Sequence, residues 1–163
     1  MKYWKSILLL LLFCVTLVGC GNSSRPSDLP PLNPCKITIT QNGVKLNKAD
    51  VEVVSKDSSV KYRSSSGITN DNGVAELLTY GFSGVPVGKY KVLVRKTVLE
   101  GAVEQTDKIV EKQVTGGTDY NLVNIKYQDE NTTDLELEIK TGQNEFTFDV
   151  GEPVHVPLES IPM

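Results

Sequence analysis

Apolar and polar residues alternate along much of the chain after residue 35, and a period of two is typical of β-strands. In residues 90–95, one predicted face carries Tyr90, Val92 and Val94, and the other carries Lys91, Leu93 and Arg95. Similar patterns predict strands at residues 36–40, 49–53, 62–68, 74–79, 109–114, 135–140 and 145–150. No part of the sequence after residue 20 has a sustained helical period, so we expect an all-β protein.

Residues that favour tight turns separate these predicted strands. Residues 70–73 (Asn-Asp-Asn-Gly) and 41–43 (Gln-Asn-Gly) tolerate positive φ or hydrogen-bond their own backbone, and residues 141–144 form a similar group. Gly81, Gly84 and Gly88 interrupt the pattern before residue 90. Short strands with turns at this spacing predict an antiparallel Greek-key β-sandwich of seven to eight strands, with one face of each sheet buried.

The first 19 residues have the pattern of a secretory signal peptide. Lys2 and Lys5 precede an apolar run of about a dozen residues, shorter than the ~20 residues that a membrane-spanning helix needs. The run ends in Leu17, Val18, Gly19 and Cys20, which resembles the lipobox of bacterial lipoproteins. The resemblance implies cleavage before Cys20, with acyl chains on its sulfur and its new amino group, whereas the alternative is an ordinary secretory signal with a cysteine near its end.

Removal of residues 1–19 would leave 144 of the 163 residues. We expect residues 20–34, which contain four prolines, to form a flexible and unpacked linker from the lipidated cysteine. Residues 35–150 are the predicted sandwich domain, and residues 151–163 a C-terminal tail or edge strand. Gly21, rather than aspartate, follows the lipobox cysteine, which by the same resemblance favours the outer membrane if the host has one.

Charge and cysteine content exclude some functions. Loss of Lys2 and Lys5 with the signal would change the net charge from −3 to −5, and an acidic chain without a basic patch argues against nucleic acid as a partner. Cys14 leaves with the signal and Cys20 carries lipid, so Cys35 has no intramolecular disulfide partner. We expect Cys35 to be a small apolar residue at the start of a strand rather than a reactive thiol.

Three motifs suggest a family. They are G-V-x-L-x-x-A-x-V-x-V over residues 43–53, T-N-D-N-G over residues 69–73, and V-P-V-G-K-Y-K-V-L-V over residues 85–94. This order resembles carboxypeptidase-regulatory-like domains, which belong to a transthyretin-like (prealbumin-like) group of β-sandwiches. Residues 127–150 resemble the closing strands of such domains in small bacterial lipoproteins. The resemblance implies a transthyretin-like or Ig-like sandwich, but sandwiches host many unrelated functions.

The sequence gives little basis for catalysis, a metal or a cofactor. Transthyretin-like hydrolases use several histidines, an arginine and a Tyr-Arg-Gly-Ser terminus, whereas this chain has one histidine, His155, between two valines. Residues 70–72 and the acidic residues Asp129, Glu130 and Asp134 lack the ligand spacing of a calcium loop, so we expect turns there. Residues 84–90 also resemble a motif of adhesin repeats with lysine–asparagine isopeptide bonds. Arg95 and Lys96 stand where those repeats place the promoting acid, so we expect no such bond.

We therefore predict a membrane-anchored cell-envelope lipoprotein whose sandwich is non-catalytic and serves binding or scaffolding, with an envelope protein as one class of partner. A carbohydrate-binding surface module is the first alternative, because Tyr80, Phe82 and Tyr90 flank the glycine-rich loop and aromatic side chains stack on sugars. The second alternative, a small transthyretin-like hydrolase, lacks an identifiable catalytic group.

Overall fold

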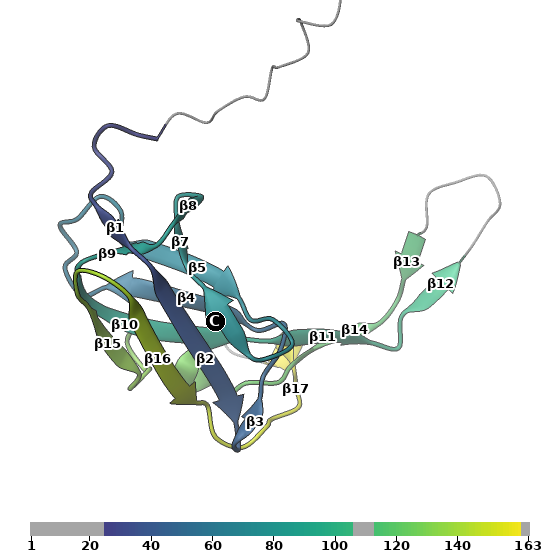
Figure 1. The fold of residues 1–163 in the computed structure, drawn as a ribbon. Helices are drawn as coiled ribbons and strands as arrows, with labels where there is room; N and C mark the ends of the chain where they lie inside the picture. The colour runs from purple at the N-terminus through teal and green to yellow at the C-terminus, as the bar shows by residue number, and fades with distance from the viewer. Residues whose placement is uncertain (1–24, 106–112, 161–163) are drawn as a thin grey trace, which may run out of the picture.

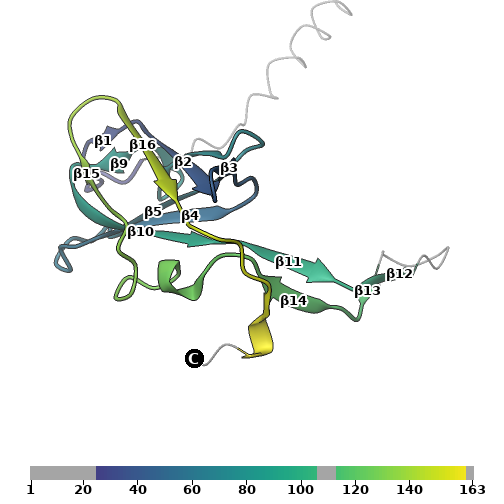
Figure 2. The ribbon, with the colours of Figure 1, turned by 90° about the horizontal axis from the view of Figure 1, so that it is seen from below.

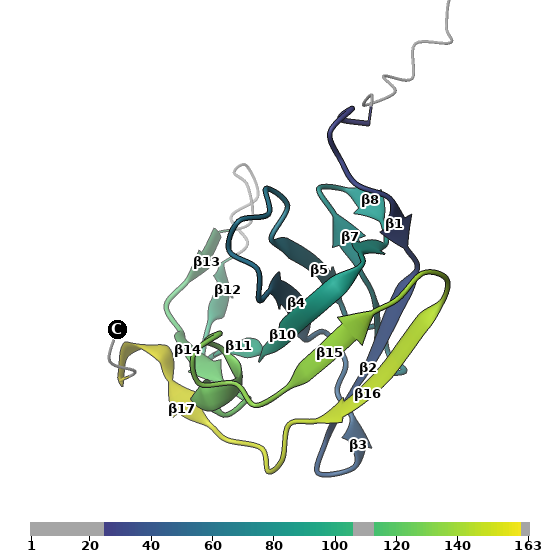
Figure 3. The same ribbon diagram turned by 90° about the vertical axis from the view of Figure 1, so that its left-hand side faces the viewer.

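Two β-sheets packed face to face form the body of the molecule in the computed structural model, which describes residues 25–105 and 113–160 (Figures 1 and 3). The first sheet has the strand order β15-β10-β4-β5-β7-β8, and the second has the order β16-β2-β3, with β6 also paired to β2. The longer strands of the sandwich are β2 (Cys35–Gln41), β4 (Asp50–Ser55), β5 (Ser64–Ile68), β6 (Val74–Glu76), β10 (Gly88–Arg95), β15 (Glu136–Ile139) and β16 (Asn144–Asp149). The short strands are β1 (Leu32–Asn33), β3 (Val44–Lys45), β7 (Leu78–Thr79), β8 (Phe82–Ser83) and β9 (Val85–Pro86).

The predicted all-β, Greek-key architecture is confirmed. Strands β4, β5 and β7 follow one another across the first sheet, and the chain then returns in β10 to lie beside β4, which is the Greek-key order. All pairings within that sheet are antiparallel. In the second sheet β16 pairs with β2 in parallel, a departure from the expected antiparallel pattern that brings the last strand of the sandwich beside its first long strand.

Alternating side chains fill the space between the sheets. Val51 and Val53 of β4 and Val92 and Val94 of β10 are fully buried, as their period-two spacing predicts. Ile37 and Ile39 of β2, Val85 and Leu137 lie in the same cluster. Cys35 belongs to it as well and begins β2, so its predicted place at the start of a strand is confirmed. Burial of several such side chains, each worth ~1.5–3 kcal/mol, supplies most of the force that holds the sheets together.

Leu93 is buried although it points away from this core, where a solvent-facing side chain was expected. The 3₁₀ helix η1 (Ile125–Tyr127) packs against β10, as Figure 2 also shows. Arg95, on the same outer face as Leu93, donates a hydrogen bond of 2.9 Å to the carbonyl oxygen of Gln128. This irregular segment between β14 and β15 therefore covers part of the outer face, which strand periodicity alone does not predict.

A β-arm extends from the end of β10, beyond the sandwich (Figures 1 and 2). It consists of β11 (Thr97–Glu100), β12 (Val103–Gln105), β13 (Gln113–Thr115) and β14 (Thr118–Asn121), with β17 (Val156–Pro157) paired to β14 and followed by η2 (Leu158–Ser160). Most of the strand expected at residues 109–114 lies outside the described residues. The strands β11 and β14 were not predicted.

Helices that could cross a membrane are absent from the two described ranges, in which helical structure is limited to short 3₁₀ turns.

Candidate functional site

The chain enters the sandwich through a short segment, residues 25–33, that is fixed to one end of it. The Arg25 guanidinium donates a hydrogen bond of 2.7 Å to the carbonyl oxygen of Pro30, which closes this segment into a loop. The side chain of Leu29 is only 6% exposed, and Asn33 of β1 accepts a hydrogen bond of 3.0 Å from the N–H of Gly142. Strand β1 pairs with β9 in antiparallel register.

The structure thus differs from the flexible linker that was expected over residues 20–34. From Arg25 onward the chain is packed rather than extended into solvent, because Leu29 buries apolar surface and Asn33 gains backbone partners. Gly84 permits the approach, since a Cβ atom there would lie 2.8 Å from the carbonyl oxygen of Asn33. Residues 20–24 of the predicted linker lie outside the described residues.

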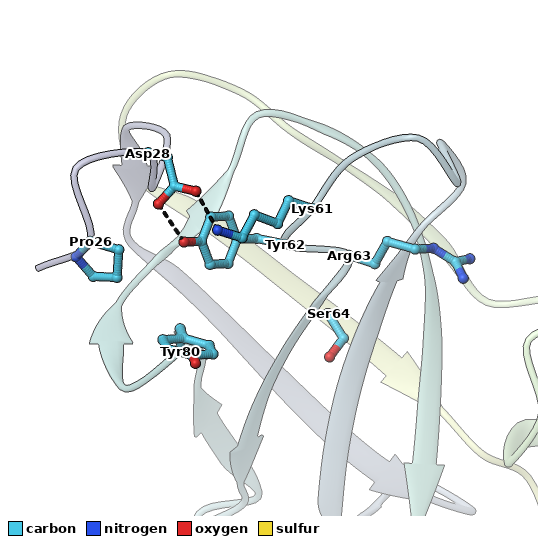
Figure 4. Close-up of a pocket in the computed structure, with 7 residues that line it drawn as sticks. All are labelled: Pro26, Asp28, Lys61, Tyr62, Arg63, Ser64 and Tyr80. Carbon is cyan, nitrogen blue, oxygen red and sulfur yellow. Dashed lines mark hydrogen bonds and ion pairs between the residues drawn. The ribbon is translucent and has the colours of Figure 1, made fainter.

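Asp28 is the main polar connection between this segment and the sandwich (Figure 4). Its carboxylate forms an ion pair with Lys61 and accepts a hydrogen bond of 2.8 Å from the hydroxyl of Tyr62. The hydrogen bond from Lys61 and, next, that from Tyr62 hold the pKa of Asp28 below its usual value. The same contact with Asp28 raises the pKa of Lys61, so the pair stays ionised at neutral pH.

Beside this connection lies a pocket of about 350 Å³, lined by Pro26, Asp28, Lys61, Tyr62, Arg63, Ser64 and Tyr80. Tyr62 and Tyr80 meet edge to face, with ring centroids 5.8 Å apart. The ring of Tyr80 is 74% exposed and sits on the turn between β7 and β8, where its φ is +54°. The guanidinium of Arg63 points away from the pocket and donates a hydrogen bond of 3.1 Å to Glu130.

A larger cavity of about 840 Å³ adjoins this pocket and shares Asp28, Lys61 and Tyr62 with it. Its walls come from the entering segment, the loop between β4 and β5, and the start of β10. Much of the lining is apolar, from Pro30, Pro31, Val60, Pro86 and Val87, with the lysines 56, 61 and 89 among the polar lining residues. The two hollows form one surface, which we call the entry face.

The three aromatic residues proposed from the sequence lie in different environments. Tyr80 is on the entry face, Phe82 is half-buried in β8 opposite Thr79, and Tyr90 is 2% exposed in the core. The hydroxyl of Tyr90 donates a hydrogen bond of 2.9 Å to the carbonyl oxygen of Pro86, and burial raises its pKa to about 12. Tyr90 therefore cannot stack on an external ligand. Tyr62 was not predicted as a site residue. It lies in a polar segment, and the sequence around it does not indicate that it contacts Asp28 and Tyr80.

Asn70 and Asp129, two of the residues considered for metal binding, form turns with their side-chain oxygens. The Oδ1 atom of Asn70 accepts hydrogen bonds from the N–H groups of Asn72, at 2.9 Å, and Val74, at 3.1 Å. Asp129 likewise accepts a hydrogen bond of 2.7 Å from the N–H of Asn131. Within the described residues, no three side chains of histidine, cysteine, aspartate or glutamate are grouped as a metal site requires.

His155 contacts the β-arm. Its ring stacks on Tyr120, with centroids 4.0 Å apart, and its Nε2 atom lies 3.2 Å from a carboxylate oxygen of Glu100. The side chain is exposed, and these contacts join the C-terminal segment to β11 and β14. These contacts give His155 a structural role at the junction with the β-arm.

Lys96 contacts the side chain of an asparagine, Asn47, so this pair bears on the isopeptide bond considered above. Its Nζ donates hydrogen bonds to the side-chain oxygen of Asn47, at 3.1 Å, and to the carbonyl oxygen of the same residue, at 2.8 Å. Burial, and then the charge of Lys48, lower the pKa of Lys96.

Leu17, Val18, Gly19 and Cys20, the predicted lipidation motif, lie outside the described residues.

Comparison with known proteins identifies no family: no family of known sequences matches the chain, and no curated protein does so. Among solved structures, a variant of BcpA, the major pilin subunit of Bacillus cereus, is similar over 77% of this chain, with 15% sequence identity and a TM-score of 0.36. The match spans 30% of the pilin subunit's own length. A similarity at this level assigns neither family nor function, so the transthyretin-like relationship and the lipobox stay predictions.

Proposed function

We propose that the protein is a lipid-anchored component of a bacterial cell envelope, attached through Cys20, whose β-sandwich serves non-catalytic binding or scaffolding. The observation that carries the proposal is the succession of Leu17, Val18, Gly19 and Cys20 at the end of a charged and then apolar N-terminal run. Two or three acyl chains, each contributing ~0.8 kcal/mol per buried methylene, would make the attachment effectively permanent. Gly21 favours the outer membrane where the host has one.

The test is membrane fractionation and intact mass of the wild-type protein, Cys20→Ser and Cys14→Ser. Cys20→Ser should release the protein from the membrane fraction and abolish the added acyl mass. Cys14→Ser is the matched control, because it changes a cysteine inside the predicted signal and leaves the lipobox intact. A Cys20→Ser protein that still sediments with membranes, or a wild-type protein without acyl mass, would contradict the anchor.

The partner is tested by crosslinking the lipidated protein in living cells and identifying by mass spectrometry what is captured. A reproducible envelope protein, absent after Cys20→Ser has removed the protein from the membrane, would support the scaffold function. Turnover of a substrate that His155→Ala abolishes would contradict the non-catalytic function.

Carbohydrate binding is the second candidate, and the exposed ring of Tyr80 beside the polar groups of the smaller pocket favours it. Aromatic faces with neighbouring hydrogen-bonding groups suit the alternately apolar and hydroxylated surface of a sugar. An oligosaccharide that binds the wild-type protein should lose affinity on Tyr80→Ala. Val44→Ala is the control, since Val44 is equally exposed but lies on β3, away from the entry face.

A further inference from the structure

The tether that would join the sandwich to the membrane is short. Because Asp28, Leu29 and Asn33 fix the entering segment, the chain is held to the sandwich from about Arg25 onward and not only from residue 34. Four residues lie between Cys20 and Arg25, so the two are five Cα-to-Cα steps apart, and a fully extended chain covers ~3.3–3.6 Å per step. Arg25 would therefore lie within roughly 17 Å of an acylated cysteine in the membrane surface.

The entry face surrounds the point where the chain leaves the sandwich. Pro26, the residue after Arg25, lines the same pocket as Tyr80, and Figure 4 shows both. The adjoining cavity adds Val60 and Val87, both exposed, the latter at 58%. The far end of β2, a strand of seven residues, lies ~20 Å from the end where the chain enters. A tether of this length thus keeps the entry face nearer to the lipid anchor than the surface at that far end.

The chemistry of this face fits the boundary between lipid headgroups and acyl chains. Tyrosine has an apolar ring and a polar hydroxyl, and it is enriched at that depth. Exposed valines can enter the outer hydrocarbon, while lysine and arginine place their charges among phosphates. Lys61, Lys89 and Arg25 are exposed on or beside the entry face, with Tyr80 at its edge. Lys61 is paired with Asp28, which lines the face together with Asp57, so Lys89 and Arg25 are the cations that would meet phosphates.

We propose that the entry face, through Tyr80, Val60 and Val87, rests on the headgroup region of the membrane that holds the Cys20 lipid. The proposal depends on the lipid anchor proposed above. It orients the sandwich with β3 directed away from the bilayer, so that partners would reach the β3 end rather than the hollows around Asp28.

Tryptophan fluorescence tests this orientation, because the one tryptophan of the sequence, Trp4, lies in the predicted signal peptide. Tyr80→Trp and Val87→Trp each place a single reporter on the entry face, at two separate positions in case one variant folds poorly. Val44→Trp places the control reporter on β3. Each lipidated protein, its acyl mass verified, is reconstituted in vesicles of phosphatidylcholine and phosphatidylglycerol, with and without lipids brominated near the headgroup.

Brominated lipid should quench Tyr80→Trp and Val87→Trp and leave Val44→Trp unchanged, with blue-shifted emission for the first two. An acylated protein in which the entry-face reporters are not quenched, or in which all three are quenched equally, would overturn the orientation alone. A protein without acyl chains would overturn the anchor and the orientation together. Entry-face reporters that ignore brominated lipid but respond to an oligosaccharide would replace the membrane with a sugar as the occupant of this face.

Discussion

The hydroxyl of Thr69 lies 2.7 Å from the carbonyl oxygen of Leu46, to which it donates a hydrogen bond. The same hydroxyl accepts a hydrogen bond of 2.8 Å from the N–H of Ala49, and all three residues are buried. Thr69 follows β5, and Leu46 and Ala49 lie between β3 and β4, so one side chain supplies both partners that two buried backbone groups need. Thr69 thus links the end of β5 to the segment in which the chain passes from β3, in the second sheet, to β4, in the first.

Replacing Thr69 with valine keeps its shape and removes both hydrogen bonds. A buried backbone group left without a partner costs ~1–3 kcal/mol, and this substitution affects two such groups. Thr69→Val should therefore lower the free energy of unfolding by ~1 kcal/mol or more. Thr69→Ser is the control, since it retains the hydroxyl and loses only a methyl group. Urea unfolding of both variants measures the difference, and a Thr69→Val protein as stable as Thr69→Ser would show that the backbone groups find other partners.

Much of the sandwich was predictable because period-two alternation reports directly which side chains enter a core. Val51, Val53, Val92 and Val94 follow that pattern. Leu93 does not, since its burial depends on the segment around η1, and no local pattern predicts a covering segment. Strands β11 and β14 of the β-arm were missed because each has four residues, which leaves few positions for a period to emerge.

The candidate site was predicted only in part, for a related physical reason. Tyr80 stood out because it is aromatic and beside glycines, but its partner Tyr62 comes from a distant, polar part of the sequence. The proline-rich composition of residues 26–34 is typical of linkers, yet Leu29 packs against the sandwich and Asp28 binds Tyr62. Such contacts are tertiary, so composition carries no information about them.

Gly73 and Gly43 provide a matched pair for separating steric contact from backbone strain. Both have positive φ, +71° and +76°, so alanine is strained at either position. A Cβ at Gly73 would lie 2.7 Å from the carbonyl oxygen of Ile39, whereas a Cβ at Gly43 meets nothing within 4 Å. Gly73→Ala should therefore destabilise the protein by ~1–3 kcal/mol more than Gly43→Ala.

Thermal or urea unfolding of the two glycine variants measures that difference. Equal destabilisation would mean that the turn of residues 70–73 shifts enough to relieve the contact at no cost.

The connection between Asp28 and the sandwich should persist in acid. Hydrogen bonds from Lys61 and then Tyr62 lower the pKa of Asp28 from its usual 3.8, so the folded state binds this proton less readily than the unfolded state does. The stability that the connection contributes is therefore present above the unfolded pKa and is lost as pH falls through the folded one. NMR titration of the Asp28 carboxyl carbon should give a midpoint below 3.8.

Lys61→Met should raise that midpoint more than Tyr62→Phe does, since Lys61 is the larger cause of the shift. Asp57 is the internal control, because its own lowered pKa comes from hydrogen bonds with Ser59 and should not respond to either change. An Asp28 midpoint that is unchanged in Lys61→Met would mean that the ion pair does not form in solution.

Cys35 should be chemically inert in the folded protein. Burial raises the pKa of its thiol from 9.0 to about 11, and the thiolate is the reactive form, so a disulfide reagent at pH 8 should label it only after unfolding in urea. Because Cys20 of the lipidated protein would carry its lipid on sulfur, Cys35 would be the thiol that the assay reports.

The raised pKa of Cys35 also predicts an alkaline loss of stability. The folded state keeps the Cys35 proton at a pH where the unfolded state has lost it, so unfolding releases a proton and stability falls as pH rises from about 9 to about 11. Burial raises the pKa of Tyr90 from 10.0 to about 12, which adds a second decline over that higher range. Urea unfolding across this pH range should therefore show a free energy of unfolding that begins to fall near pH 9 in the wild-type protein and near pH 10 in Cys35→Ala.

If Cys35→Ala shows the same pH profile as the wild type, the thiol of Cys35 is not held protonated by burial. A Tyr90→Phe control that removes the decline below pH 10 would instead assign that decline to the tyrosine.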